Sequence, residues 1–148
     1  MTVTVRPVTA ADYAAWRPLW DGYVRFYEAS VPDEITDATF ARCLDRDAPV
    51  YCFVAEADGA LVGFATIVLH LGTWSLAPVC YLEDLFVGEA ARGKGVARAL
   101  LDYLAETGRA QGWRRLYWQT RRDNATARAL YDKVGTLTDW VRYDVELA

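Results

Sequence analysis

The sequence predicts a mixed α/β fold with helices on both faces of one sheet. Three observations support this prediction: the elements follow the order β-α-α-β-β-β-α-β-α-β, three consecutive strands are joined by short connections, and a later strand, helix and strand form a crossover. Short connections favour an antiparallel meander, whereas a crossover joins parallel strands and is almost always right-handed. The expected sheet is therefore antiparallel with one parallel pair.

The N-terminal part of the chain is predicted to form a strand and two helices. Alternating valines indicate a strand over residues 3–8. A helical pattern of aromatic residues follows Thr9 and runs to Tyr27. Pro18 is expected to kink or split this helix, because proline lacks the N–H that an interior helical position needs. A second helix is expected over residues 33–44.

The rest of the chain alternates between strands and helices. Asp58-Gly59 separates two apolar runs and is typical of a hairpin turn. Helices are expected where apolar residues recur at helical spacing, and strands where apolar runs are short or alternate. The expected strands are 50–57, 61–69, 79–87, 115–120 and 140–147, and the expected helices are 95–108 and 124–134.

Composition restricts the class of protein. The 148 residues suit a single domain over 1–148, and no apolar stretch is long enough to span a membrane. The N-terminus does not resemble a signal peptide, which predicts a cytoplasmic protein. Cys43, Cys52 and Cys80 have no disulfide or metal-site spacing and are expected to be reduced. His70 is the single histidine, so we expect no metal, and we expect no nucleic-acid or membrane partner.

The net charge of −4 conceals two regions of opposite sign. Residues 21–47 hold seven acidic and three basic side chains, whereas residues 88–122 hold three acidic and eight basic ones. Solvated helix faces would explain this equally well. The functional interpretation is that the second region binds an anionic ligand and the first meets a cationic one.

The segment 92–98 has the features of a phosphate-binding loop. It joins a predicted strand to a predicted helix, and its two glycines allow several N–H groups to converge beside the helix N-terminus. A P-loop needs Ser or Thr after the lysine, but Gly95 follows Lys94. A dinucleotide-binding loop needs a third glycine where Arg98 stands. A different pyrophosphate-binding loop is the remaining interpretation.

With this loop, the sequence resembles the GNAT (Gcn5-related) N-acetyltransferase superfamily. Arg92, Gly95 and Ala97 match the family's acetyl-CoA motif, Gln/Arg-x-x-Gly-x-Gly/Ala. Residues 81–87 resemble its fourth strand, and 124–131 resemble its Asn-x-x-Ala-x-x-x-Tyr segment. The resemblance extends over nearly the whole chain and implies the GNAT acyl-CoA N-acyltransferase fold.

A narrower resemblance concerns the possible acceptor. Residues 69–74 and 116–120 are similar to the yeast histone and polyamine acetyltransferase subgroup. Glu83-Asp84 is similar to the pair in spermidine/spermine and thialysine acetyltransferases. These matches imply a polyamine, another small amine or a lysine-like group as the acceptor.

The family resemblance implies roles for individual residues. Acetyl-CoA is the implied co-substrate, with pantetheine along a strand edge and pyrophosphate in the loop. Tyr131 is the implied general acid for the departing thiolate, although its helical spacing also suits a core aromatic residue. The expected CoA-binding residues are Leu85, Phe86, Val87, Arg92, Gly93, Lys94, Gly95, Val96, Ala97, Arg98 and Asn124.

The proton of the amine needs an acceptor, and three residues are candidates. Glu83 is the first choice for the catalytic base. Asp84 follows it, and strand alternation predicts that the two carboxylates face opposite sides. His70 has a suitable pKa, but a lone histidine near a strand end is more often structural. We expect Tyr27, Glu28, Asp84 and His70 to contact the acceptor.

The leading hypothesis is an N-acetyltransferase in which the amine attacks the thioester of acetyl-CoA directly. A non-catalytic acetyl-CoA-binding sensor is the alternative, although it would need neither Tyr131 nor Glu83. A nucleotide-binding domain is a third possibility, disfavoured because no Mg²⁺-binding hydroxyl follows Lys94. We also expect a homodimer.

Overall fold

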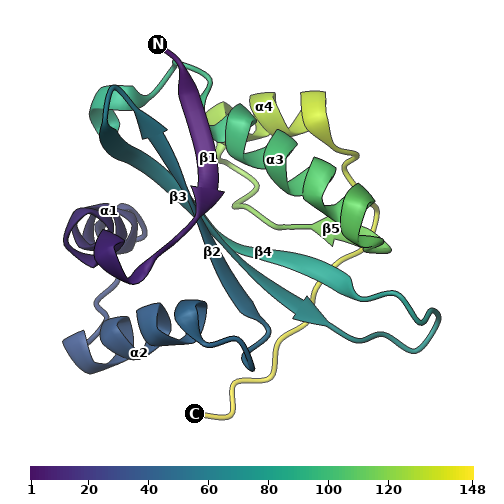
Figure 1. Cartoon of the computed structure of the whole chain (residues 1–148). Coiled ribbons are helices and arrows are strands. Elements are labelled where there is room, and N and C mark those ends of the chain that lie inside the picture. Colours follow the sequence, from purple (N-terminus) through teal and green to yellow (C-terminus); the bar gives the residue numbers. More distant parts are fainter. The chain divides into compact units, whose positions relative to one another are not determined.

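A computed structural model of the protein describes all 148 residues and divides into two compact units, Met1–Trp118 and Gln119–Ala148 (Figure 1). The first unit contains β1 (Val3–Pro7), η1 (Ala10–Asp12), α1 (Tyr13–Phe26), α2 (Asp33–Leu44), β2 (Val50–Ala57), β3 (Ala60–His70), β4 (Val79–Val87), η2 (Glu89–Ala91), α3 (Val96–Gln111) and β5 (Arg115–Tyr117). The second contains α4 (Ala125–Val134).

The sheet has the predicted mixed architecture. Its five strands lie in chain order, β1 to β5, with antiparallel pairing as far as β4 and parallel pairing between β4 and β5. Helix α3 makes the crossover between that parallel pair. The mixed α/β prediction is therefore confirmed.

Helices cover both faces of the sheet in the first unit, with α1 and α2 on one side and α3 on the other (Figure 1). Successive side chains of each strand point to opposite faces of the sheet. In β3, Phe64 packs with Trp16 of α1 and Phe40 of α2. Its neighbour Gly63 faces Val96 of α3. Each large side chain buried in this way contributes about 1.5–3 kcal/mol of transfer free energy.

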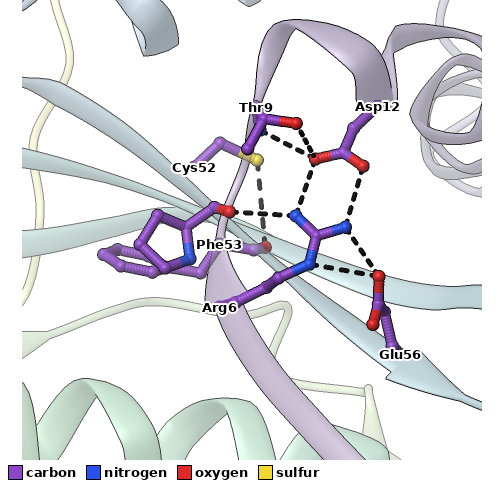
Figure 2. A network of polar contacts seen from close by, with 7 residues as sticks. Arg6, Thr9, Asp12, Cys52, Phe53 and Glu56 are labelled. Atoms are coloured by element: carbon purple, nitrogen blue, oxygen red, sulfur yellow. Dashed lines mark hydrogen bonds and ion pairs between the residues drawn. The ribbon is translucent and has the colours of Figure 1, made fainter.

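A polar network fastens the first strand to its neighbours (Figure 2). The two terminal nitrogens of Arg6 each lie 2.8 Å from an oxygen of Asp12, and Nη2 lies 2.6 Å from Oε1 of Glu56. The Arg6 guanidinium and the Thr9 hydrogen bonds lower the pKa of Asp12 well below its usual value. One arginine thus joins β1, η1 and β2.

The predicted strand over 140–147 is wrong. Residues 136–148 form neither helix nor strand, and the side chains of Trp140, Tyr143 and Leu147 are each 90% exposed. The alternating pattern is present, but a strand also needs a hydrogen-bonded partner, which a local pattern does not specify.

Two smaller expectations also need correction. Of the two outcomes expected at Pro18, the split is wrong, because α1 continues through that residue; the kink stays a prediction. The loss of one backbone hydrogen bond there is compensated by packing, because Trp16 and Trp20 anchor the helix on either side. Strand β5 ends at Tyr117 instead of Thr120, since its pairing with β4 stops there.

No helix combines the length and the apolar composition that crossing a membrane requires.

Candidate functional site

A β-bulge in β4 shapes the centre of the first unit. Thr66 of β3 pairs with Asp84, but the next residue of β3, Ile67, pairs with Leu82, so Glu83 has no partner. A bulge of this kind interrupts the alternation of side chains and is common beside active sites. Asp84 is consequently directed toward the face that α1 covers.

Asp84 is a buried carboxylic acid in a strand otherwise rich in apolar residues. Its exposed fraction is 8%. Burial raises the pKa of Asp84 to about 6, and the nearby charge of Glu83 raises it further, whereas hydrogen bonds from Tyr23 and Thr66 lower it. At neutral pH, Asp84 is mostly ionised yet still close to its pKa, which suits an acceptor of protons.

Aromatic side chains of α1, and of Tyr27 directly after it, lie beside Asp84. The ring of Tyr23 lies 5.2 Å from that of Tyr27 and 6.1 Å from that of Phe86. Burial raises the pKa of Tyr23 far above its usual value, with the Asp84 charge as the second cause. Glu28, directly after Tyr27, adopts a left-handed conformation with φ of 54°, which is uncommon outside glycine.

Glu83 and Asp84 differ in exposure, although both lie near Tyr23. Glu83 is exposed, whereas Asp84 is buried. The charges of both carboxylates nevertheless raise the pKa of Tyr23, so both lie near that phenol. The bulge disrupts the regular pairing of the strand at these two residues.

The loop between β4 and α3 has the backbone geometry predicted for an anion site. Gly93 and Gly95 have φ angles of 74° and 82°, in the left-handed region that favours glycine. Helix α3 begins directly after Gly95, and no side chain caps its first N–H groups. These N–H groups and the positive end of the helix dipole favour binding of a phosphate. Val96, the first residue of the helix, is buried, whereas Ala97 is half-buried.

The basic side chains of the loop have partners within the protein. Arg92 donates from Nε to the carbonyl oxygen of Val87 at 3.1 Å, and its guanidinium lies 5.4 Å from the ring centre of Phe86. The Nζ atom of Lys94 donates to the Ala90 carbonyl oxygen at 3.1 Å. Arg98, one turn into α3, pairs with Asp102 at 3.1 Å. All three basic residues are exposed.

Strand β4 separates from β5 before it reaches the site. Pairing with β5 covers only Val79 to Tyr81, whereas pairing with β3 continues to Val87. The edge of β4 that includes Leu85, Phe86 and Val87 therefore has no strand beside it. Such an edge can accept an extended ligand as an additional strand.

The structure places His70 apart from Asp84. Its Nε2 atom lies 3.0 Å from the hydroxyl oxygen of Tyr117, and its Nδ1 atom lies 3.1 Å from the carbonyl oxygen of Leu71. His70 pairs with Val79, which is about 16 Å from Asp84 along β4 at the usual rise of a strand. His70 thus links the end of β3 to β5.

Tyr131 and Asn124 belong to the second unit. The Asn124 side chain accepts a hydrogen bond from the N–H of Ala127 at 3.3 Å, which caps α4, and it donates to Thr120 at 3.3 Å. Tyr131 lies in the last turn but one of α4 and is half-buried.

Sequence reasoning did not single out Thr66 or the pairing of Tyr23 with Asp84. Thr66 carried no signal, because a threonine in a strand is common. Tyr23 stood at helical spacing from Tyr27 and was equally compatible with a core position. The one detectable signal was the presence of acidic residues within an otherwise apolar strand. This signal indicated Asp84 as much as Glu83.

Comparison with known proteins connects this geometry to a family. The Acetyltransferase (GNAT) family model matches residues 16–136. D-amino-acid N-acetyltransferase HPA3 of Saccharomyces cerevisiae is 35% identical over 143 residues, which cover 95% of this chain and 89% of that protein. Aminoglycoside N(6')-acetyltransferase type 1 of Salmonella enteritidis is 26% identical over 138 residues, covering 88% of this chain and 89% of that protein.

Solved structures show the same fold. The aminoglycoside N-acetyltransferase AAC(6')-Iy, solved with the bisubstrate analogue CoA-S-monomethyl-acetylneamine, matches with a TM-score of 0.84 at 23% identity, and the match covers 100% of both chains. A structure described as a probable acetyltransferase matches with a TM-score of 0.87 at 26% identity. The fold, the loop before α3 and the family match agree, and the chain therefore belongs to the GNAT family of acetyltransferases.

Proposed function

We propose that this enzyme transfers the acetyl group of acetyl-CoA to the primary amine of a small molecule, and that Asp84 accepts the amine proton. The observation that carries this proposal is the buried carboxylate with a pKa of about 6, located at a bulge four residues before the loop to α3 begins at Gly88. A sensor of acetyl-CoA would need the loop, but it would not need a buried acid, which is costly to maintain.

Deprotonation of the acceptor is the step that requires Asp84. A lysine-like amine has a pKa of about 10.4 and is protonated at neutral pH, so it cannot attack a thioester. An ionised Asp84 accepts this proton directly or through a water molecule. Glu83, the first choice from the sequence, is the competing base. It is the weaker candidate, because its side chain is exposed whereas Asp84 is buried beside Tyr23.

The residues between β4 and α3 fit acetyl-CoA, which would supply an activated acetyl thioester. The uncapped N–H groups of Val96, Ala97 and Arg98 and the turn at Gly93 and Gly95 suit a pyrophosphate. Arg92, Lys94 and Arg98 would add positive charge. The open edge of β4 at Leu85, Phe86 and Val87 suits the amide groups of pantetheine.

Tyr131 is the proposed donor of a proton to the thiolate that leaves. A phenol with a pKa near 10 is a reasonable acid for this step. Asn124 is the proposed further contact with pantetheine, besides its role as the cap of α4. We expect Tyr131→Phe to lower kcat at least tenfold while the affinity for acetyl-CoA is retained. An unchanged kcat would remove Tyr131 from the mechanism.

The proposed acceptor is an amino acid or another small amine. The yeast relative is named for D-amino acids, and the Salmonella relative is named for aminoglycosides. All of these acceptors present an amine, and cationic amines suit a site with Glu83, Asp84 and Tyr27 near the Tyr23 phenol. Glu28 directly follows Tyr27 and is the proposed further acidic contact.

The experiment that tests the function measures release of free CoA thiol from acetyl-CoA. The acceptors are several D-amino acids with their L-enantiomers, spermidine, lysine, thialysine, an aminoglycoside and a histone-tail peptide. Turnover with one class and not the others establishes the reaction and the acceptor. A protein that binds acetyl-CoA tightly but turns over none of these amines would contradict the proposal of a small-amine acceptor.

We also propose that the protein is a cytoplasmic homodimer. Exposed apolar side chains support a self-association surface: Leu71, Trp74 and Leu76 lie in the loop after β3 and are 84%, 85% and 103% exposed. Three free cysteines are consistent with a reducing compartment. Analytical ultracentrifugation of the wild type and of Trp74→Ser tests the dimer, and a monomeric wild type would contradict it.

A further inference from the structure

The side chain of Arg92 connects the end of α1 with the end of β4. Its guanidinium carbon, Cζ, lies 6.0 Å from the ring centre of Phe26, the last residue of α1, and 5.4 Å from the ring centre of Phe86 in β4. Its Nε atom also donates a hydrogen bond to the carbonyl oxygen of Val87 at 3.1 Å. Both ring distances suit cation–π interactions, which extend to about 6 Å. A residue of the predicted phosphate loop is therefore attached to the helix whose aromatic side chains lie beside Asp84.

Contacts between aromatic rings continue from Arg92 to the proposed acceptor site. On one route, the Phe86 ring lies 6.1 Å from the Tyr23 ring. On the other, the Phe26 ring lies 5.2 Å from the Tyr27 ring, which in turn lies 5.2 Å from the Tyr23 ring. These separations are typical of favourable aromatic pairs. Both routes end at Tyr23, so the position of the Arg92 side chain is coupled to that of the phenol.

Close packing of α1 on β4 restricts movement at this point. A Cβ atom on Gly22 of α1 would lie 3.1 Å from two carbons of the Phe86 ring. The helix therefore approaches the ring as closely as a residue without a side chain allows. Phe86 contacts both this helix and the Arg92 guanidinium, and its position depends on both.

The other two basic side chains of the loop have only local partners. The Nζ atom of Lys94 donates to the carbonyl oxygen of Ala90, four residues earlier, and Arg98 pairs with Asp102, one turn along α3. Neither contact joins distant elements of the first unit. Arg92 is the one of the three that reaches α1, and this difference indicates a role for its side chain beyond its charge.

We propose that the Arg92 side chain positions the acceptor site: it holds the end of α1 against β4, so that the Tyr23 and Tyr27 side chains stay beside Asp84. This role is additional to the charge that Arg92 would contribute beside the phosphates. Loosening the end of α1 should mainly weaken acceptor binding, because Tyr27 is a proposed acceptor contact, whereas the N–H groups of α3 stay in place. The inference rests on the proposed function, since it concerns the amine that accepts the acetyl group.

Steady-state kinetics with both substrates test the proposal. Arg92→Lys keeps the positive charge but loses the planar guanidinium and the Nε donor, so it isolates the positioning role. We expect this variant to raise the KM of the amine about tenfold, with the KM of acetyl-CoA within about twofold of the wild type. Lys94→Met is the matched control, because it removes a loop charge that has no contact with α1. It should raise the KM of acetyl-CoA and leave that of the amine within about twofold of the wild type.

Gly22→Ala alters the same packing from the side of α1 and changes no charge. Its methyl group would press on the Phe86 ring, so we expect the KM of the amine to rise at least about threefold while that of acetyl-CoA is retained. Alanine is a better helix former than glycine, so a loss of helix stability would not explain this effect. This variant tests the proposal even where a substitution of Arg92 fails to fold.

Hydrogen exchange at the end of α1 supplies a readout that needs no substrate. The N–H groups of residues 27–29 donate back to carbonyl oxygens of the helix at 2.9 to 3.3 Å, so their exchange reports whether its end is held. We expect faster exchange over 27–29 in Arg92→Lys and wild-type exchange in Lys94→Met. If the wild type acetylated no amine, the proposed function would fail, and this measurement would still decide the role of Arg92.

Three results would overturn the proposal. An amine KM in Arg92→Lys or Gly22→Ala within about twofold of the wild type would show that the contact between Arg92, Phe86 and α1 does not control acceptor binding. Equal exchange over 27–29 in the wild type and Arg92→Lys would show that the side chain does not hold the helix. A KM of acetyl-CoA raised as much in Arg92→Lys as in Lys94→Met would make Arg92 a phosphate-binding residue alone.

Discussion

Tyr23 of α1 donates a hydrogen bond to the carboxylate of Asp84 on β4. Burial raises the pKa of the phenol so far that Tyr23 remains protonated, and therefore a donor, throughout the range in which enzymes work. The bond favours the charged form of Asp84 and opposes the effect of burial. The helix residue thus lowers the pH at which the strand residue becomes a base, whereas burial raises it.

The first prediction separates the two candidate bases. The value of kcat/KM should fall about tenfold per pH unit below pH 6, because Asp84 becomes protonated there. Asp84→Asn should lower kcat by about 100-fold or more and remove this dependence. Glu83→Gln should retain most of the activity and shift the acid limb to lower pH, since the Glu83 charge raises the pKa of Asp84. Full pH–rate profiles of the three proteins provide the measurement.

The opposite ranking of these variants would reassign the base. If Glu83→Gln lost activity about 100-fold and Asp84→Asn retained it, Glu83 would be the base and Asp84 a structural acid. Equal small effects in both variants would point to bulk water as the proton acceptor.

The second prediction concerns the hydrogen bond between Tyr23 and Asp84. Tyr23→Phe removes a donor that lowers the pKa of Asp84, so the acid limb of the pH–rate profile should move to higher pH. At a pH well above the limb, kcat should be close to that of the wild type. Tyr27→Phe is the matched control, because Tyr27 contacts the Tyr23 ring but makes no contribution to the pKa of Asp84. An unmoved limb in Tyr23→Phe would mean that the phenol does not tune Asp84.

The elements that the sequence predicts well are those whose signals are local. The pattern over 95–108 predicted α3, because apolar residues recur at helical spacing and Gly95 can adopt the left-handed angle before the first turn. The order of strand, helix and strand predicted the parallel pair, since crossovers have a fixed hand. The prediction of an anion site at the loop rests on the same local features.

The remaining features depend on contacts between distant parts of the chain. The bulge at Glu83 reflects a register between β3 and β4 that neither strand specifies alone, so the sequence of β4 did not predict it. The pKa of Asp84 depends on Tyr23 and Thr66, which are brought to it only by folding. The apolar alternation at 140–147 indicated a strand, but nothing in the segment supplied a partner.

The third prediction compares two glycines with the same backbone strain. Gly95 has φ of 82° before α3, and Gly59 has φ of 78° in the hairpin between β2 and β3. A residue with a side chain at either position should cost about 1 kcal/mol of stability, because the left-handed region is unfavourable for it. Gly95→Asp should also abolish detectable binding of CoA by calorimetry, since it adds a negative charge beside the N–H groups of α3.

The Gly59→Asp variant controls for the loss of stability. It should melt at about the same temperature as Gly95→Asp and bind CoA like the wild type. If both variants lost CoA binding equally, instability would explain the effect. If neither did, the loop before α3 would not be the phosphate site.

The last prediction is that Asp84→Asn makes the protein more stable at neutral pH while making it less active. The pKa of Asp84 is about 6 in the folded state, above the value of about 3.9 expected when the chain is unfolded. The folded state therefore binds more protons between these values, and the free energy of unfolding falls as the pH rises from about 4 to about 6. Above that range the charged acid costs about 1–3 kcal/mol, and asparagine avoids this cost.

Urea unfolding at several pH values measures this difference. The free energy of unfolding of Asp84→Asn should exceed that of the wild type by an amount that grows from acid to neutral pH. The control is Glu83→Gln at an exposed position, whose free energy of unfolding should stay within about 0.5 kcal/mol of the wild type throughout. An Asp84→Asn variant that is less stable at pH 8 would mean that the hydrogen bonds from Tyr23 and Thr66 outweigh the energetic cost of burying the charge. The ionised carboxylate would then stabilise the folded state, contrary to this prediction.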